Sequence, residues 1–473
     1  MIRFLVPLAV CLALAPTALA QQKPGDPIRL TVSPAKPPVR PLQYRFTFEE
    51  VAKRTGNAAT DYKEAGRLYR EARGSEGVAF ETQQDVWLEG DLKDLPIKEV
   101  EQFFETNKEI WPLLEKAARC DRCDWGHREG LRKQGFSFTI PEIQDMRGLV
   151  RLVAVHSRLN LAKGKIDESL HDVRLGLVMA HNTADSPILI SALVGFALTG
   201  VMLNRIDEIV QQPGAPSLYS ALTDLPTPYI SLRPAFDGER LGAYGTFPGA
   251  VECIEDLKAG PFSEKQVQDG LKALNGLFGG ASKYLVALNI ASKHETAKKA
   301  LIEAGRPKEK VDAMPHFQVA LLHAVLDYDR QLDEMQLNQT LPPWESYRKT
   351  PKPPAPPTEL YQLMGEPVGP AIPLARFVLP AIQKIARAQI RTDRRIAALR
   401  CVEAIRLYAA AHDGKLPPSL SAIKDMKLPV DPLTGTPFEY TVTDKTAVLK
   451  GNVPPEEKNQ PAQGLTYEIT IRQ

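Results

Sequence analysis

The stretch YAAAHDGKLPPSL, residues 408–420, ends a long helix-forming run. No Gly or Pro interrupts residues 381–412, and the apolar side chains of this run recur at helical spacing, so the sequence predicts a helix with one buried face. The opposite face carries Arg400, Glu403 and Arg406. Gly414 can adopt the left-handed conformation that terminates a helix, and the prolines at 417 and 418 prevent the helix from resuming.

The stretch DPLTGTPFEY, residues 431–440, has the composition of a turn that leads into a strand. Apolar and polar residues alternate in two segments beyond the turn, which is typical of strands with one buried side. The alternating apolar positions are Phe438, Tyr440 and Val442, and then Leu465, Tyr467, Ile469 and Ile471. Together with the preceding helix they predict a small α+β module over residues 375–473, built from one long helix and a short antiparallel sheet.

This module resembles the globular domain of the type II secretion major pseudopilins over residues 380–473. The residues that match the pseudopilin pattern are Tyr408, Gly414, Pro417, Asp431, Pro432, Gly435, Pro437 and Tyr440. The resemblance implies a non-enzymatic docking module linked to an envelope or secretion assembly. The arrangement of the whole chain also resembles a group of exported helical bacterial proteins with no known activity.

The N-terminus has the three parts of a cleaved export signal. Arg3 provides the positive charge, residues 4–15 form an apolar stretch, and Ala18-Leu-Ala20 is a small-x-small cleavage site. We therefore expect residues 1–20 to be a signal peptide and the mature protein to be extracytoplasmic, either periplasmic or secreted. The alternative is a cytosolic protein whose first strand is apolar.

The amino-acid composition and net charge of the chain indicate which kinds of molecule it binds. The chain has 473 residues, of which 43% are hydrophobic and 25% charged, with 59 Lys and Arg against 57 Asp and Glu. A formal net charge of +2 gives no field of one sign to hold nucleic acid, so we expect a protein partner instead. The uncharged run 188–203 is shorter than the ~20 residues that span a bilayer, which favours a buried core helix. We expect no integral membrane segment after signal removal.

Proline divides the chain into regions. Residues 21–45 and 346–374 are rich in proline. We expect both segments to be extended spacers that form neither a β-sheet nor a helix. Residues 46–345 between them show helical periodicity and no convincing strand, which predicts an all-α domain, most simply an irregular helical bundle. The strongest periodic segments are 59–72, 100–118, 146–180, 187–211, 265–274, 281–304 and 314–337.

Residues 162–170 favour a tight helical hairpin within this domain. Gly164 suits the turn, and Ser169 and Gly176 are small enough to let antiparallel helices approach closely. The hairpin resembles a tetratricopeptide unit. A stable array needs about three repeats, so a short helical-repeat scaffold is the alternative to the bundle.

Four cysteines remain after signal removal, namely Cys120, Cys123, Cys253 and Cys401. In an exported protein the pair Cys120 and Cys123 is a disulfide candidate, although the connectivity among the four is open. The alternatives are unpaired structural cysteines and a metal or redox site.

Three residues of the segment 314–337 share one helix face: His316, His323 and Asp327. Only His323 and Asp327 are close enough to bind one ion together, and a third ligand would have to come from His156 or His171. A polar seam between helices explains the same pattern without a metal. We therefore expect neither a metal nor any other cofactor.

The familiar catalytic signatures are absent from the sequence: no G-x-S-x-G elbow, H-E-x-x-H motif, P-loop or dinucleotide-binding glycine pattern occurs. Dispersed carboxylates such as Glu239, next to Arg240, could still act in a cleft. Two hypotheses follow. The first is an exported interaction or scaffold protein, and the alternative is an extracytoplasmic hydrolase with a pocket in the helical domain, with or without a metal.

Overall fold

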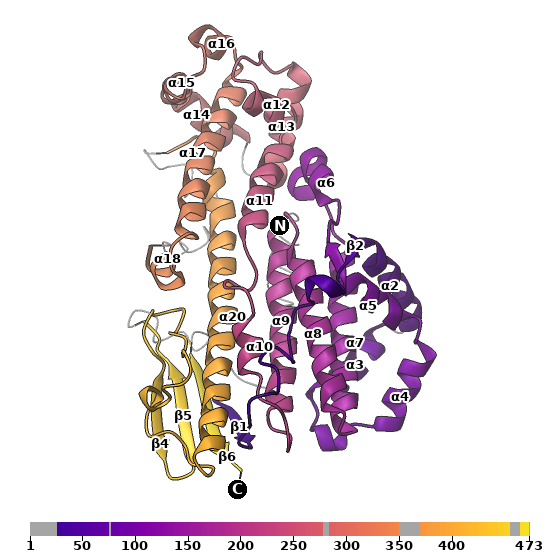
Figure 1. Ribbon diagram of the computed structural model, residues 1–473. Coiled ribbons are helices and arrows are strands. Elements are labelled where there is room, and N and C mark those ends of the chain that lie inside the picture. The colour runs from indigo at the N-terminus through magenta and orange to yellow at the C-terminus, as the bar shows by residue number, and fades with distance from the viewer. Residues whose placement is uncertain (1–25, 75–76, 278–282, 350–368, 455–463, 473) are drawn as a thin grey trace.

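The computed structural model describes residues 26–74, 77–277, 283–349, 369–454 and 464–472. The fold is mainly α, with a small four-stranded sheet beside the C-terminal helix (Figure 1). The predicted signal peptide lies outside the described residues. The helices are α2 (Ala58–Arg73), α3 (Gly77–Glu89), α4 (Ile97–Thr106), α5 (Ile110–Ala118), α6 (His127–Gln134), α7 (Glu142–Ala162), α8 (Ile166–Ala184), α9 (Leu189–Ile209), α10 (Tyr219–Thr223), α11 (Arg233–Gly245), α12 (Ala250–Glu255), α13 (Glu264–Leu277), α14 (Lys283–Ser292), α15 (His294–Glu303), α16 (Lys308–Asp312), α17 (His316–Asn338), α18 (Pro343–Lys349) and α20 (Leu374–Ala411).

The predicted hairpin is formed by α7 and α8, with Gly164 in the turn at a positive φ of 72°. The hydroxyls of Ser157 and Ser169 lie 2.8 Å apart where the two helices meet. Gly176 faces α9 instead, where a Cβ atom would approach the Sδ atom of Met202 to 2.5 Å. Small residues therefore allow α8 to pack closely on both neighbours, and α7, α8 and α9 form the centre of the helical region.

Helix α9 is the one described helix that is long and apolar enough to cross a membrane by length and composition. Its most apolar window is 72% buried within the fold. A core helix passes the same test, and this one is packed between α8 and α20 (Figure 1).

The predicted C-terminal helix is α20, which ends as expected near Gly414. The Gly414 N–H donates to the carbonyl of Ala409 at 2.8 Å, with Gly414 at a φ of 77°. The face that carries Glu403 and Arg406 is buried, not only the apolar face: both side chains have 0% exposure and form an ion pair at 2.6 Å. Helix α20 is therefore surrounded by protein along much of its length.

The main sheet has the strand order β1-β6-β5-β4, formed by β1 (Ile28–Val32), β4 (Glu439–Thr443), β5 (Thr446–Gly451) and β6 (Leu465–Ile471). Strands β4, β5 and β6 are antiparallel as predicted, but β1 pairs with β6 in parallel. The prediction that the N-terminal proline-rich segment forms no ladder is wrong for 28–32. This stretch contains no proline, and its Leu30 and Val32 side chains are buried. The prediction that the second proline-rich segment forms no helix is wrong for 346–349, which belong to α18, and residues 350–368 of that segment lie outside the described residues.

Two further strands correct the all-α prediction for residues 46–345. Strands β2 (Arg54–Asn57) and β3 (Cys120–Arg122) form a short parallel pair. Both are too short to produce an alternating pattern of buried residues, which explains why the sequence did not indicate them.

The C-terminal residues do not stand apart from the helical region. The Arg406 guanidinium donates to the carbonyls of Ala215 at 2.8 Å and Ser33 at 3.1 Å. The Oδ1 atom of Asp393 accepts the backbone N–H of Tyr229 at 2.9 Å. Helix α20 is thus part of the main core, to which the sheet and the N-terminal strand are attached.

Candidate functional site

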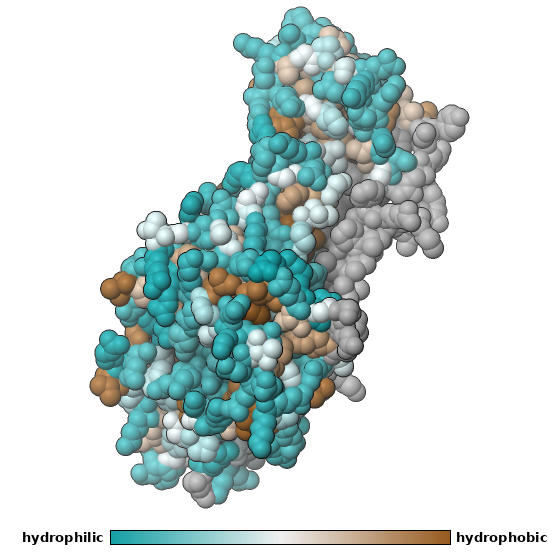
Figure 2. All heavy atoms as spheres, turned by 90° about the vertical axis from the view of Figure 1, so that its right-hand side faces the viewer, coloured by the Kyte–Doolittle hydropathy of each residue, from teal (hydrophilic) through white to brown (hydrophobic). Residues whose placement is uncertain are grey.

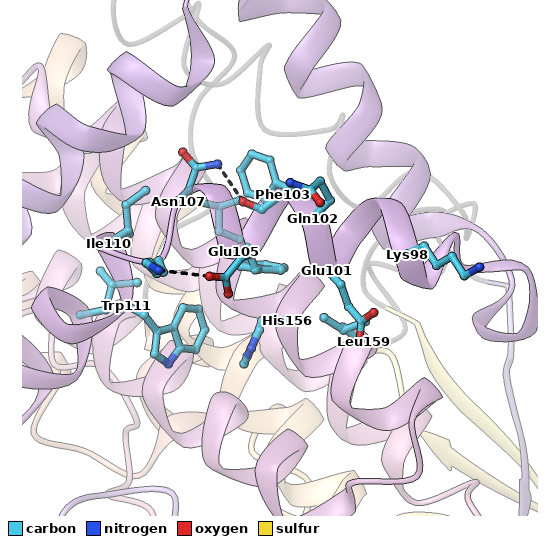
Figure 3. A pocket seen from close by; sticks show the side chains of 14 residues that line it. Lys98, Glu101, Gln102, Phe103, Glu105, Asn107, Ile110, Trp111, His156 and Leu159 are labelled. Atoms are coloured by element: carbon cyan, nitrogen blue, oxygen red, sulfur yellow. Dashed lines mark hydrogen bonds and ion pairs between the residues drawn. The ribbon is translucent and has the colours of Figure 1, made fainter.

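The candidate site is a cavity of about 580 Å³ between α4, α5 and α7 (Figure 3). We call it the aromatic cavity, because Phe103, Phe104 and Trp111 line it beside His156. Half of its lining residues are apolar and half are polar or charged. The polar ones are Lys98, Glu101, Gln102, Glu105, Asn107, Lys108 and His156.

A sharp turn between α4 and α5 brings the aromatic rings together. The predicted run 100–118 is two helices, because Asn107 closes α4: both its backbone N–H and its side-chain amide donate to the carbonyl of Phe103. Phe104 then meets Trp111 edge to face, with ring centroids 6.0 Å apart at 86°. All three aromatic side chains remain partly exposed. Partly exposed rings in a concave site are a common feature of ligand-binding pockets.

His156 forms one wall of the cavity, with its ring centroid 4.1 Å from that of Trp111 and 4.8 Å from that of Phe104. Its Nδ1 atom lies 2.9 Å from the Oδ2 atom of Asp172 on α8. Asp172 also accepts from the side-chain amide of Asn160 at 2.8 Å. Burial raises the pKa of Asp172, and the hydrogen bond and charge of His156 oppose that rise.

The carboxylate of Asp172 favours the tautomer of His156 that carries its proton on Nδ1. The Nε2 atom makes no hydrogen bond within the described part of the chain, so it is the ring nitrogen available to a ligand. A buried Asp behind a His is the arrangement that orients a general base. The same arrangement can hold the His side chain in one orientation so that it forms a hydrogen bond with a bound ligand.

The charged residues at the rim of the cavity largely neutralise one another. Glu105 pairs with the Lys108 ammonium at 3.1 Å (Figure 3). Glu101 forms an ion pair with Lys163. Lys98 and the amide of Gln102 are exposed at the same rim. The site therefore presents many hydrogen-bonding groups without a strong field of either sign.

The residues considered as candidate metal ligands do not converge. His316, His323 and Asp327 lie on α17, but Asp327 accepts hydrogen bonds from Arg330 and Gln331. The suggested third ligands are engaged on other helices, His156 with Asp172 and His171 with Glu115. Among the described residues no group of three His, Cys, Asp or Glu side chains could hold a metal ion.

The candidate disulfide between Cys120 and Cys123 is not formed in the structure, where Cys253 and Cys401 are also free thiols. The Cys120 thiol lies 3.5 Å from the carbonyl of Lys116, and Cys123 is buried in the core. Burial raises the pKa of both thiols, which keeps them in the unreactive protonated form.

Glu239, the carboxylate suggested for a cleft, is buried in α11. Burial raises its pKa to about 8, and a hydrogen bond with the backbone of Leu189 opposes that rise. Its neighbour Arg240 pairs with Asp333 at 2.5 Å. A smaller cavity of about 230 Å³ is lined by Arg240 but not by Glu239, so the two side chains do not act on a common space.

Three of the residues on which the expected pseudopilin resemblance rests make structural contacts. Asp431 accepts from the Arg394 guanidinium at 2.7 Å and caps its own turn through the Leu433 N–H at 2.9 Å. The Tyr440 hydroxyl donates to the carbonyl of Pro417 at 3.0 Å. Tyr408 stacks on the ring of His412, with the ring centroids 3.7 Å apart.

No protein-family model, curated protein or solved structure matches the chain. The aromatic cavity is also the part of the molecule that sequence reasoning missed. Phe103, Phe104 and Trp111 lie within 100–118, which the sequence indicates only as one periodic helical segment, and His156 is considered there only as a metal ligand. The turn at Asn107 was the local signal that could have separated them.

Proposed function

We propose that the protein is an exported, non-enzymatic binding and interaction protein that takes up its ligand in the aromatic cavity. The observation that supports this proposal is the cavity itself, which combines three partly exposed aromatic rings with polar groups of fixed orientation. Its volume lies within the ~300–1,000 Å³ that is usual for small-ligand sites.

The surface around the site also favours a small ligand over a broad protein interface. Figure 2 shows the face that lies on the right-hand side of Figure 1, where α2 to α5 are found. That face is largely hydrophilic, and its apolar side chains occur in small separate patches. A large protein partner would be expected to cover a wider apolar area.

In this proposal the C-terminal sheet docks the protein to an envelope component, as the pseudopilin resemblance implies. Within the described chain β4 is an edge strand that pairs with β5 alone. An exposed strand edge can accept a strand from a partner protein. Val442 on β4 is 36% exposed, so Val442→Lys is the variant that tests docking without disturbing the aromatic cavity.

The test of ligand binding uses the uncharged fluorescent dye N-phenyl-1-naphthylamine. We expect one dye molecule per chain to bind in the cavity and to be displaced by material from the native extracytoplasmic fraction. Trp111→Ala should lose this binding. Tyr219→Ala, which removes a half-buried aromatic ring from α10, should retain it. Equal dye binding by both variants, or dye that nothing in the fraction displaces, would contradict the proposal.

The alternative is an extracytoplasmic hydrolase, and the pair of His156 and Asp172 is the observation that favours it. Such a pair can activate water as a general base. Among the described residues that line the cavity there is no Ser, Thr or Cys to act as a nucleophile. A panel of p-nitrophenyl esters and glycosides tests this function. Turnover that disappears in His156→Ala would replace the binding proposal.

A further inference from the structure

The chemistry of the aromatic cavity indicates its ligand class. This inference rests on the proposed binding function and goes one step further. The cavity holds apolar rings and hydrogen-bonding groups in close alternation, whereas a purely apolar ligand would need only the rings. Each polar group at the rim must either form a hydrogen bond with the ligand or keep its hydrogen bonds to water. The ligand should therefore carry polar groups along its edge and apolar surface on its faces.

The charges around the cavity favour a ligand without net charge. The carboxylate of Glu105 is paired with Lys108, and that of Glu101 with Lys163. A third carboxylate, Asp172, lies behind His156 and is hydrogen-bonded to it. Sites for anions or cations normally gather several charges of the opposite sign, and here the two signs alternate.

The hydrogen-bonding groups of the rim match hydroxyls better than any other common group. A hydroxyl both donates and accepts, so it can be satisfied by carboxylates, amides, ammonium groups and imidazole alike. The side-chain amide nitrogen of Asn107 donates to Phe103, which leaves its oxygen free to accept. The Nε2 atom of His156 can accept from a hydroxyl in the tautomer that Asp172 favours.

The indole ring of Trp111, which lies beside the ring of His156, provides the complementary apolar surface. Their planes are inclined at 46° with centroids 4.1 Å apart, and both lie at the wall of the cavity (Figure 3). A pyranose ring has C–H groups on its faces and hydroxyls at its edge. The negative face of an aromatic ring attracts such weakly positive C–H groups. We infer that the aromatic cavity binds a neutral oligosaccharide, with one sugar ring against Trp111 and its hydroxyls bonded by His156 and the polar rim.

Isothermal titration calorimetry of the mature chain with maltotriose, cellotriose and N,N′,N″-triacetylchitotriose tests this inference. We expect at least one of the three to bind saturably. Trp111→Ala should weaken that binding by roughly tenfold or more, which corresponds to at least ~1.4 kcal/mol. Tyr219→Ala should bind as the unchanged protein does. Gln102→Ala removes an exposed side chain whose loss does not threaten the fold, and should weaken binding several-fold.

Failure of this inference is distinguishable from failure of the proposed function. If the dye binds and is displaced by native material but none of the three saccharides binds at about 10 mM, the cavity is a ligand site of another class and the inference is wrong. If neither dye nor saccharide binds, both proposals are wrong. Saccharide binding that survives in Trp111→Ala and Gln102→Ala would place the sugar elsewhere and would also overturn the inference.

Discussion

The guanidinium of Arg395 on α20 donates to the carboxylate of Asp207 on α9 at 2.5 Å, and both side chains are largely buried. A second nitrogen–oxygen contact of 2.6 Å joins Arg395 to the side chain of Asn204. Removing two charges from water is costly, and the mutual attraction of the pair offsets that cost, although the buried Nε atom of Arg395 has no hydrogen-bond partner within the described part of the chain. The contact therefore fixes the position of α20 on α9 and attaches the C-terminal residues to the helical region.

Loss of one partner of this pair should be strongly destabilising. In Asp207→Ala the guanidinium of Arg395 stays buried without its counter-charge, and we expect the free energy of unfolding to fall by about 3–5 kcal/mol. Urea unfolding followed by circular dichroism measures the change. Glu50→Ala breaks a surface pair with Lys53 and should have no measurable effect. Similar small effects in both variants would mean that the buried pair contributes little.

Removal of residues 374–473 should unfold the remaining chain instead of releasing an independent helical domain. The truncation exposes the surfaces of α9 and α17 that α20 covers and removes the strand that pairs with β1. We expect the truncated protein to show no cooperative thermal transition and to bind hydrophobic dye non-specifically. A sharp transition close to that of the full chain would instead show that residues 46–345 fold alone, as the sequence suggested.

Local patterns predicted the elements that depend on nearby residues. The end of α20 follows from Gly414 and the prolines after it, and β6 follows from alternating apolar residues that are buried in the structure. The hairpin of α7 and α8 follows from Gly164 and Ser169 in the same way.

Features that depend on distant parts of the chain could not be predicted. Ile28–Val32 becomes a strand only because β6 offers an edge more than four hundred residues later. In the sequence, Glu403 and Arg406 resemble the solvent-exposed face of a helix. In the structure they are buried, and the guanidinium of Arg406 donates to the backbone carbonyls of Ala215 and Ser33. The aromatic cavity needs Trp111, His156 and Asp172 from three helices, and helical periodicity does not tell which faces meet.

Gly238 on α11 permits a close approach to Pro187, which lies two residues before the start of α9, and replacement of Gly238 should be damaging. A Cβ atom at this position would lie 1.6 Å from the backbone carbonyl oxygen of Pro187. Because backbone cannot move aside cheaply, we expect Gly238→Ala to lower the free energy of unfolding by about 1–3 kcal/mol or more. Gly260→Ala is the matched control, since its Cβ would meet nothing within 4 Å. Equal stability of the two variants in thermal unfolding would contradict this packing.

Two buried carboxyl groups should make the protein less stable as the pH rises. Burial raises the pKa of Glu239 from 4.5 to about 8 and that of Asp393 from 3.8 to about 7. A carboxyl with a higher pKa in the folded chain binds its proton more tightly there. Its stabilising effect is fully present below the unfolded pKa and is lost as the pH rises to the folded pKa. The loss approaches ~1.4 kcal/mol per pH unit for each group within its window.

Glu239→Gln and Asp393→Asn should remove this pH dependence, because both amides stay neutral and keep an oxygen that accepts the backbone N–H of Leu189 or Tyr229. We expect each variant to lose less stability than the unchanged protein between pH 5 and pH 8, and the double variant to lose least. Unfolding temperatures measured at both pH values provide the comparison. Asp26→Asn, which neutralises an exposed carboxylate, should follow the unchanged protein. Parallel pH profiles for all four variants would show that neither buried carboxyl titrates in this range.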